Sequence, residues 1–207
     1  MFLFSLFNSP LTFLFVAISI LTGFTVHEFF HALVADKLGD DTPRQMGRLT
    51  LNPIAHLDLL GTVFLLLAGF GWGKPVMVNP NNFENPKFDN LTVALAGPIS
   101  NLGLATIAGL IFRFVSMPIL LESFLVIFVF YNLVLMIFNF LPIPPLDGSK
   151  ILGIFLPEDI YNSIQQFGTF ILFGLIIFSS FIPVIPFIMT KVVGFFFSLI
   201  TGQPPLI

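Results

Sequence analysis

Long apolar runs dominate the chain and predict membrane-spanning helices. A bilayer core of about 30 Å needs roughly 20 apolar residues of helix, and residues 10–37, 90–112 and 118–141 each meet that length. The stretch 160–190 carries no charged residue and is long enough for two more helices, broken at Pro183 and Pro186, with the second continuing to about Ile200. We therefore expect about five transmembrane helices.

A more polar section, residues 38–89, separates the first two windows. Its one apolar run, 59–73, would rise only about 22 Å as a helix and is rich in glycine, so we expect it to be re-entrant or to lie on the membrane surface. Residues 46–51 and 74–79 have strand-like patterns and should line a water-filled pocket, although surface loops are an alternative. The predicted fold class is an all-α polytopic membrane protein with a re-entrant or β-hairpin-like segment between its first and second spans.

Composition supports this interpretation. Only 9% of the 207 residues are charged and 56% are hydrophobic, whereas a soluble domain has about 25% charged residues. The chain has no cysteine, which excludes thiolate metal sites and disulfides, and no basic patch indicates nucleic acid. The first apolar run lacks the features of a signal peptide, so we expect a retained helix. Residues 1–207 should form one domain, with a catalytic core over about 10–150 and an accessory helix pair over about 160–201.

The main candidate for chemistry is the sequence His27-Glu28-Phe29-Phe30-His31, which lies inside the first apolar window after 26 residues without Asp, Glu, Lys or Arg. Ionisable groups are expensive in hydrocarbon and usually mark a function there. On a helix, positions i and i+4 share one face, so the two imidazoles can bind one metal ion with the glutamate beside it.

A catalytic zinc typically takes three protein ligands, and Asp147 is the best candidate for the third. It follows the proline-rich end of the third window, where the chain should continue in an extended form that can bend back. For Asp147 to reach His27 and His31, the helix of window 118–141 must run parallel to the helix of window 10–37. Only an odd number of complete spans can then lie between them, and window 90–112 is one, so the run 59–73 should not cross the membrane. Alternatively, Asp147 caps a turn or pairs with Lys150.

Other candidate ligands have weaker local context. His56, the third histidine, could be a rival ligand, a group that supports a ligand, or a loop residue paired with Asp58. A downstream glutamate could instead be the third ligand, and the candidates are Glu84, Glu122 and Glu158.

The chemistry that this site favours is amide hydrolysis. Zinc activates a bound water and polarises a carbonyl, and Glu28 can take the proton from that water and pass it to a leaving amine. The substrate is then expected to be a membrane protein with a transmembrane segment, unwound locally and able to pair with an edge strand at 46–51. The alternatives are a catalytically silent metal-binding scaffold and a metal-ion transporter.

Three motifs together resemble the site-2 protease family of intramembrane zinc metalloproteases, in its compact branch without a PDZ domain. They are the His27–His31 motif, a Gly-x-x-x-Asn element at 97–101, and the segment 139–148 that ends in Leu-Asp-Gly. The resemblance implies one zinc ion held by His27, His31 and Asp147, with Glu28 as the catalytic carboxylate. It also implies that Asn101 and Asn139 lie near the site and help to position substrate or backbone, although interhelical hydrogen bonding is an alternative.

Basic residues predict the orientation in a prokaryotic cell membrane. Six of them lie on the side that holds 36–90 and 142–165, against Arg113 and Lys191 on the other side. The positive-inside rule makes the first side cytoplasmic, so the active site should face the cytosol and the C-terminus should be cytoplasmic.

Overall fold

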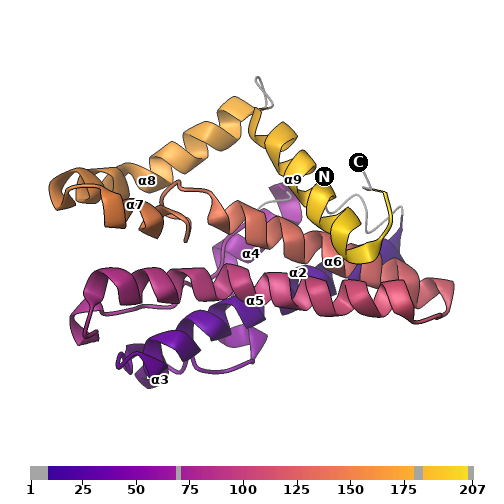
Figure 1. Cartoon of the computed structure of the whole chain (residues 1–207), viewed down its shortest axis with the longest axis horizontal. Helices are drawn as coiled ribbons and strands as arrows, with labels where there is room; N and C mark the ends of the chain where they lie inside the picture. Colours follow the sequence, from indigo (N-terminus) through magenta and orange to yellow (C-terminus); the bar gives the residue numbers. More distant parts are fainter. Residues whose placement is uncertain (1–8, 69–70, 180–183, 205–207) are drawn as a thin grey trace.

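The computed structural model describes residues 9–68, 71–179 and 184–204, and within them the protein is built of helices (Figure 1). Two short 3-10 turns, Pro53–Ala55 and Pro80–Asn82, lie in the connections. The helices are α2 (Pro10–Lys37), α3 (Thr42–Gln45), α4 (Leu59–Ala68), α5 (Pro86–Phe114), α6 (Ile119–Phe140), α7 (Ser149–Phe155), α8 (Glu158–Ser179) and α9 (Val184–Thr201).

Among the described residues, three helices are long and apolar enough to cross a membrane: α2, α5 and α6. They confirm three of the predicted windows as helices. Figure 1 shows α2 and α6 running in one direction and α5 in the other, so α2 and α6 are parallel as the position of Asp147 requires. The ends of α2 follow local chemistry, since Pro10 occupies its first turn and Gly39, with φ of +104°, ends it in a conformation that favours glycine.

The main core lies where α5, α6 and α9 meet. Its buried side chains are aliphatic and aromatic, and they interlock small residues of α5 with larger ones of α6 and α9. They are Ala105, Ala108, Leu125, Val129, Leu133, Met136, Ile137, Val193, Phe197 and Ile200. This packing fixes α6 against α5, and α6 carries the loop that holds Asp147.

The accessory helices α8 and α9 form an arch over one face of the bundle in Figure 1. Helix α8 begins with Glu158 and Asp159 and carries further polar residues in its first turns, and α9 has 18 residues. Neither is among the three candidate spans, so a total of five spans stays a prediction. The expected break at Pro183 lies outside the described residues.

The segment between α2 and α5 differs from its prediction in one respect. Helix α4 has ten residues, about 15 Å of helix, which is too short to cross a bilayer. Whether it is re-entrant or lies on the surface stays a prediction, and Gly69 lies outside the described residues. The expected strands are wrong, because the described residues of this segment hold only an isolated antiparallel bridge between Leu57 and Gly73.

The physical reason is that the backbone N–H groups of both segments have other partners. Around 46–51, the amides of Gly47 and Arg48 close turns onto Arg44 and Pro43. In 74–79, two amides are bound by carboxylates from elsewhere in the chain: Val76 N–H by Glu28 at 3.2 Å and Asn79 N–H by Asp40 at 2.7 Å. A strand ladder in either segment would need those same donors.

Candidate metal centre

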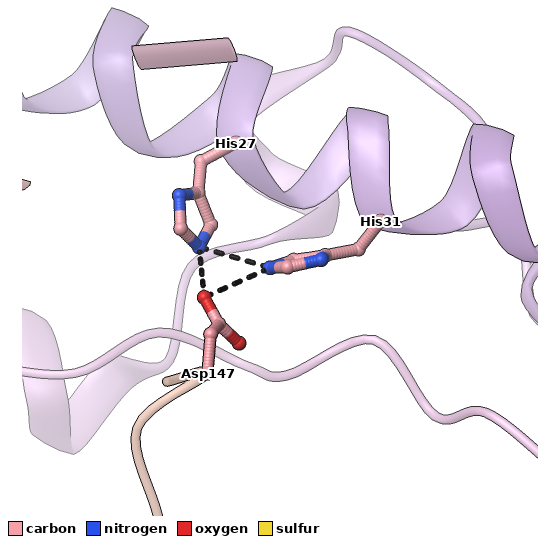
Figure 2. A group of neighbouring side chains, drawn as sticks. All are labelled: His27, His31 and Asp147. Carbon is pink, nitrogen blue, oxygen red and sulfur yellow. Dashed lines mark hydrogen bonds and ion pairs between the residues drawn. The ribbon is translucent and has the colours of Figure 1, made fainter. Parts of the chain in front are cut away.

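The two histidines of α2 project from one face of the helix towards a common point (Figure 2). Both are buried, with 4% of His27 and 7% of His31 exposed. Their rings lie edge to face with centroids 4.5 Å apart, and the two Nε2 atoms are 2.9 Å apart. The i, i+4 spacing therefore brings the predicted pair of ligand atoms together.

Hydrogen bonds on the far side of each ring define which nitrogen carries the proton. His31 Nδ1 lies 2.7 Å from the carbonyl oxygen of Val93, which can only accept, so Nδ1 donates. His27 Nδ1 lies 2.8 Å from Asn101 Oδ1 and donates in the same way. Each neutral imidazole is then left with a bare lone pair on Nε2, which is the atom that binds a metal.

Helix α5 supplies the acceptor for His31 at a disturbed turn. Pro98 lies inside α5, and a proline in a helix interior lacks the N–H donor and displaces the preceding turn of carbonyls. The ring of Pro98 clashes with the carbonyl of Ala94, four residues before it. The carbonyl of Val93, one residue further back, accepts from His31, so the acceptor lies next to the part of α5 that the proline disturbs.

Asp147 reaches the histidines from a compact loop after α6. The expected extended path is wrong: the loop turns twice, through Ile143 N–H to Leu141 O and Leu146 N–H to Ile143 O, and Gly148 N–H donates to Asn139 O at 2.7 Å. This last bond closes the loop onto the end of α6. A Cβ at Gly148 would lie 2.2 Å from Phe140 O, so the closure needs glycine.

The three predicted ligand atoms converge. Asp147 Oδ2 lies 3.1 Å from His27 Nε2 and 3.3 Å from His31 Nε2 (Figure 2). Contact with Lys150 runs through the Asp147 backbone carbonyl. Within the described residues, these three form the one group of acidic or histidine ligand atoms close enough to share an ion.

This group of atoms fits a zinc ion. Two ligands of a tetrahedral zinc lie roughly 3.3 Å apart when each bond is about 2.0–2.1 Å, close to the spacing of the three atoms. Asp147 Oδ2 is buried and has no hydrogen-bond donor, while both Nε2 atoms present lone pairs. Three atoms that all offer electron pairs at this spacing repel one another unless a proton or a metal cation lies among them.

Glu28 lies beside this cluster with 8% of its surface exposed. Its Oε2 accepts from Val76 N–H at 3.2 Å, so the 74–79 segment holds one oxygen of the carboxylate. The segment is itself tied down by Lys74 N–H, which donates to His56 O at 2.8 Å. The polar section between α2 and α5 therefore orients the carboxylate next to the histidines.

The remaining predicted residues lie around the cluster. Asn101 is fully buried and contacts His27 rather than an open surface. Asn139 donates from its side chain to Leu135 O at 3.0 Å and closes the Asp147 loop through its backbone. Their roles in positioning substrate stay predictions.

His56 is outside the cluster of ligand atoms. Its ring is fully buried, and its Nε2 donates to Thr50 O at 2.8 Å. The predicted pairing with Asp58 is not the contact observed, since an Asp58 side-chain oxygen accepts from Gly61 N–H. A role for His56 in supporting a ligand stays a prediction.

Two residues at the centre were given no role by sequence reasoning, although one of them, Gly97, belongs to the Gly-x-x-x-Asn element. A Cβ at Gly97 would lie 2.4 Å from His31 Nε2 and 2.7 Å from His27 Nε2, so only glycine leaves room for the pair. Asn132, a fully buried polar residue in α6, contacts Asn101 at 3.1 Å. The signals were available: an asparagine inside an apolar helix, and a glycine one helical turn before Asn101.

Comparison with known proteins shows similarity to a peptidase family and to several proteins named as zinc metalloproteases. The sequence model of peptidase family M50 matches residues 115–179. The protein named "Putative zinc metalloprotease YwhC" of Bacillus subtilis is 42% identical over 173 residues, which are 79% of this chain and 78% of that protein. Similarly named proteins are Rip2 of Mycobacterium tuberculosis, 32% identical over 82% of this chain and 70% of its own length, and MJ0611 of Methanocaldococcus jannaschii, 35% identical over 70% and 72%. No solved structure matched the chain.

Proposed function

Because this chain belongs to peptidase family M50, the site-2 protease family of zinc metalloproteases, we propose that it hydrolyses peptide bonds in or near the transmembrane segments of other membrane proteins. The observation that carries the proposal is the convergence of His27, His31 and Asp147 between two parallel apolar helices. Gathering these polar groups between apolar helices is unfavourable unless they serve a function, and their lone pairs are directed at one point.

One zinc ion per chain would be held by His27, His31 and Asp147. When bound there, zinc supplies an activated water at neutral pH and polarises a peptide carbonyl. Asn101 and Val93 keep the two imidazoles in the tautomer that offers Nε2. The chain's own residues therefore set the number and the direction of the ligands.

Glu28 acts as general base and then as general acid. Its carboxylate takes the proton from the attacking water and returns it to the leaving amine, which lets one residue serve both halves of the hydrolysis. The hydrogen bond from Val76 N–H fixes the orientation of the carboxylate. Burial beside the cluster keeps bulk water away from the reacting bond.

The substrate is a membrane protein whose helix unwinds locally, because helical carbonyls are already hydrogen-bonded. We place the active site towards the cytoplasm of a prokaryotic cell, with five spans including α8 and α9, on the distribution of basic residues. A C-terminal reporter fusion tests this arrangement, which predicts a cytoplasmic C-terminus. An external reading would overturn it.

Cleavage assays on purified protein test the function. Wild-type protein and the Glu28→Gln variant, both loaded with zinc in detergent, would be incubated with a panel of single-span peptides. We expect equal zinc content, cleavage by the wild type alone, and loss of that cleavage with chelator. Cleavage by the Gln variant at the wild-type rate would refute the role of Glu28. Zinc binding without any cleavage across the panel would favour a silent metal-binding scaffold.

A further inference from the structure

Three buried polar side chains form a line through the centre of the helix bundle, one from each of α2, α5 and α6. His27 Nδ1 donates to Asn101 Oδ1 at 2.8 Å, Asn101 Nδ2 donates to Asn132 Oδ1 at 3.1 Å, and Asn132 Nδ2 donates to Phe128 O at 2.8 Å. Asn101 and Asn132 are fully buried. Such groups are costly unless they are hydrogen-bonded, so this line is a fixed part of the fold.

The hydrogen bonds of this line all run the same way, with donation from His27 towards Phe128 O. A carboxamide can rotate by 180° and exchange its oxygen and nitrogen at almost no cost in shape. If Asn101 turned in this way, its N–H would face His27 Nδ1, which would then have to accept, and the proton would move to Nε2. That tautomer cannot bind a metal through Nε2, so the orientation of Asn101 decides whether His27 is a ligand.

Two acceptors hold Asn101 in the useful orientation: the carbonyl oxygen of Gly23, at 2.9 Å from Nδ2, and Asn132 Oδ1. Asn132 is itself held, because its Nδ2 donates to a backbone carbonyl, Phe128 O, that cannot turn over. The local packing is tight, since a Cβ at Gly23 would lie 2.7 Å from Asn132 Oδ1.

We infer that Asn132 is a positioning residue that, through Asn101, holds His27 in the tautomer that binds zinc. The inference rests on the proposed function, and it assigns a task to a residue that touches neither metal nor substrate. His31 provides an internal contrast. Its Nδ1 donates directly to Val93 O, a backbone acceptor, so it needs no side chain to set its tautomer.

Zinc affinity and histidine N–H signals test the inference without reference to cleavage. Zinc dissociation constants would be measured by chelator competition for wild type, Asn132→Leu and Leu133→Ala. The last is a matched control, because Leu133 is fully buried on the same helix and contributes apolar packing. Ring N–H signals would be recorded on zinc-loaded protein labelled with ¹⁵N-histidine, which the chain's three histidines keep simple.

We expect Asn132→Leu to bind zinc about tenfold more weakly, in line with losses seen when groups behind metal ligands are removed. One of the two metal-bound histidine signals should shift and exchange faster while the other stays unchanged. Leu133→Ala should melt at a lower temperature, yet keep its zinc affinity within about twofold and both signals. Asn132→Ala carries the same expectation as the leucine variant and replaces it if that variant does not fold.

Equal affinity and unchanged signals in the Asn132 variants would overturn the inference, and so would an equal change in both histidine signals, which would indicate general loosening. Failure of the wild-type protein to bind zinc would overturn the proposed site and this inference together. The first two results, obtained with a wild type that binds zinc and cleaves, would overturn this inference alone.

Discussion

Adding one methyl group at Gly97 should weaken zinc binding in a protein that still folds. A Cβ there would lie 2.4 Å from His31 Nε2 and 2.7 Å from His27 Nε2, whereas ordinary van der Waals contact begins at 3.4 Å. The rings or α5 must therefore give way by 1.0 Å and 0.7 Å. Metal sites tolerate errors of about 0.2 Å in ligand position, so both imidazoles cannot keep their places.

The magnitude follows from packing costs. Forcing an extra methyl group into a close-packed interior typically costs about 1–3 kcal/mol, and each 1.4 kcal/mol is a factor of ten in an equilibrium constant. Since the clash falls on the two ligand atoms themselves, we expect Gly97→Ala to weaken zinc binding by roughly fivefold to 150-fold. Cleavage should fall in parallel with zinc occupancy.

Gly103→Ala is the matched control, because Gly103 lies on the same helix and a Cβ there meets no atom within 4 Å. Replacing glycine by alanine in a helix interior stabilises it by up to about 1 kcal/mol. The assay is chelator competition in detergent, with the thermal unfolding midpoint of each variant recorded alongside. If Gly97→Ala bound zinc within twofold of Gly103→Ala, the proposed position of the ion against α5 would be wrong.

Two further predictions concern the elements that support the site. Burial alone would raise the pKa of Asp40, but hydrogen bonds from Thr42, Asn79 and Asn82 lower that pKa below 3.8. The stability that the Asp40 carboxylate contributes is therefore complete above about pH 4, and it is lost as the pH falls through the lower pKa of the folded state. Asp40→Asn should cost about 2 kcal/mol at pH 7, and its unfolding midpoint should vary less than that of the wild type between pH 7 and 3; an equal dependence would contradict this. On α8, a Cβ at Gly168 would lie 2.3 Å from Pro144, so Gly168→Ala should displace the Asp147 loop and weaken zinc binding. Gly174→Ala, where a Cβ meets nothing within 4 Å, should not, and equal zinc affinity in the two variants would argue against this support.

The sequence was informative about the site wherever a periodicity linked residues to a face. The i, i+4 spacing of His27 and His31 predicted that they share one face of their helix. The requirement that this helix and the helix before Asp147 run parallel predicted that Asp147 lies beside them, although it is more than a hundred residues away in the sequence. The apolar windows predicted α2 to the residue and α6 within one residue at each end, whereas α5 begins four residues before its window and ends two residues after it.

The connections could not be predicted in the same way, because their backbone N–H groups donate to side chains that are far away in the sequence. The N–H of Val76 binds Glu28 and that of Asn79 binds Asp40, and neither contact leaves a local pattern. Likewise, the sequence shows an asparagine inside an apolar helix and a Gly-x-x-x-Asn element, but the contacts that give Asn132 and Gly97 their roles become visible only when the three helices are placed side by side. What periodicity cannot supply is the position of one element against another.

The central claim is that His27, His31 and Asp147 together hold a zinc ion, and zinc titration of the purified protein tests it most directly. We predict one tightly bound zinc per wild-type chain and an affinity lower by at least tenfold in Asp147→Ala, with the helical content of the two proteins equal by circular dichroism. An Asp147→Ala protein that binds one zinc as tightly as the wild type would contradict the claim.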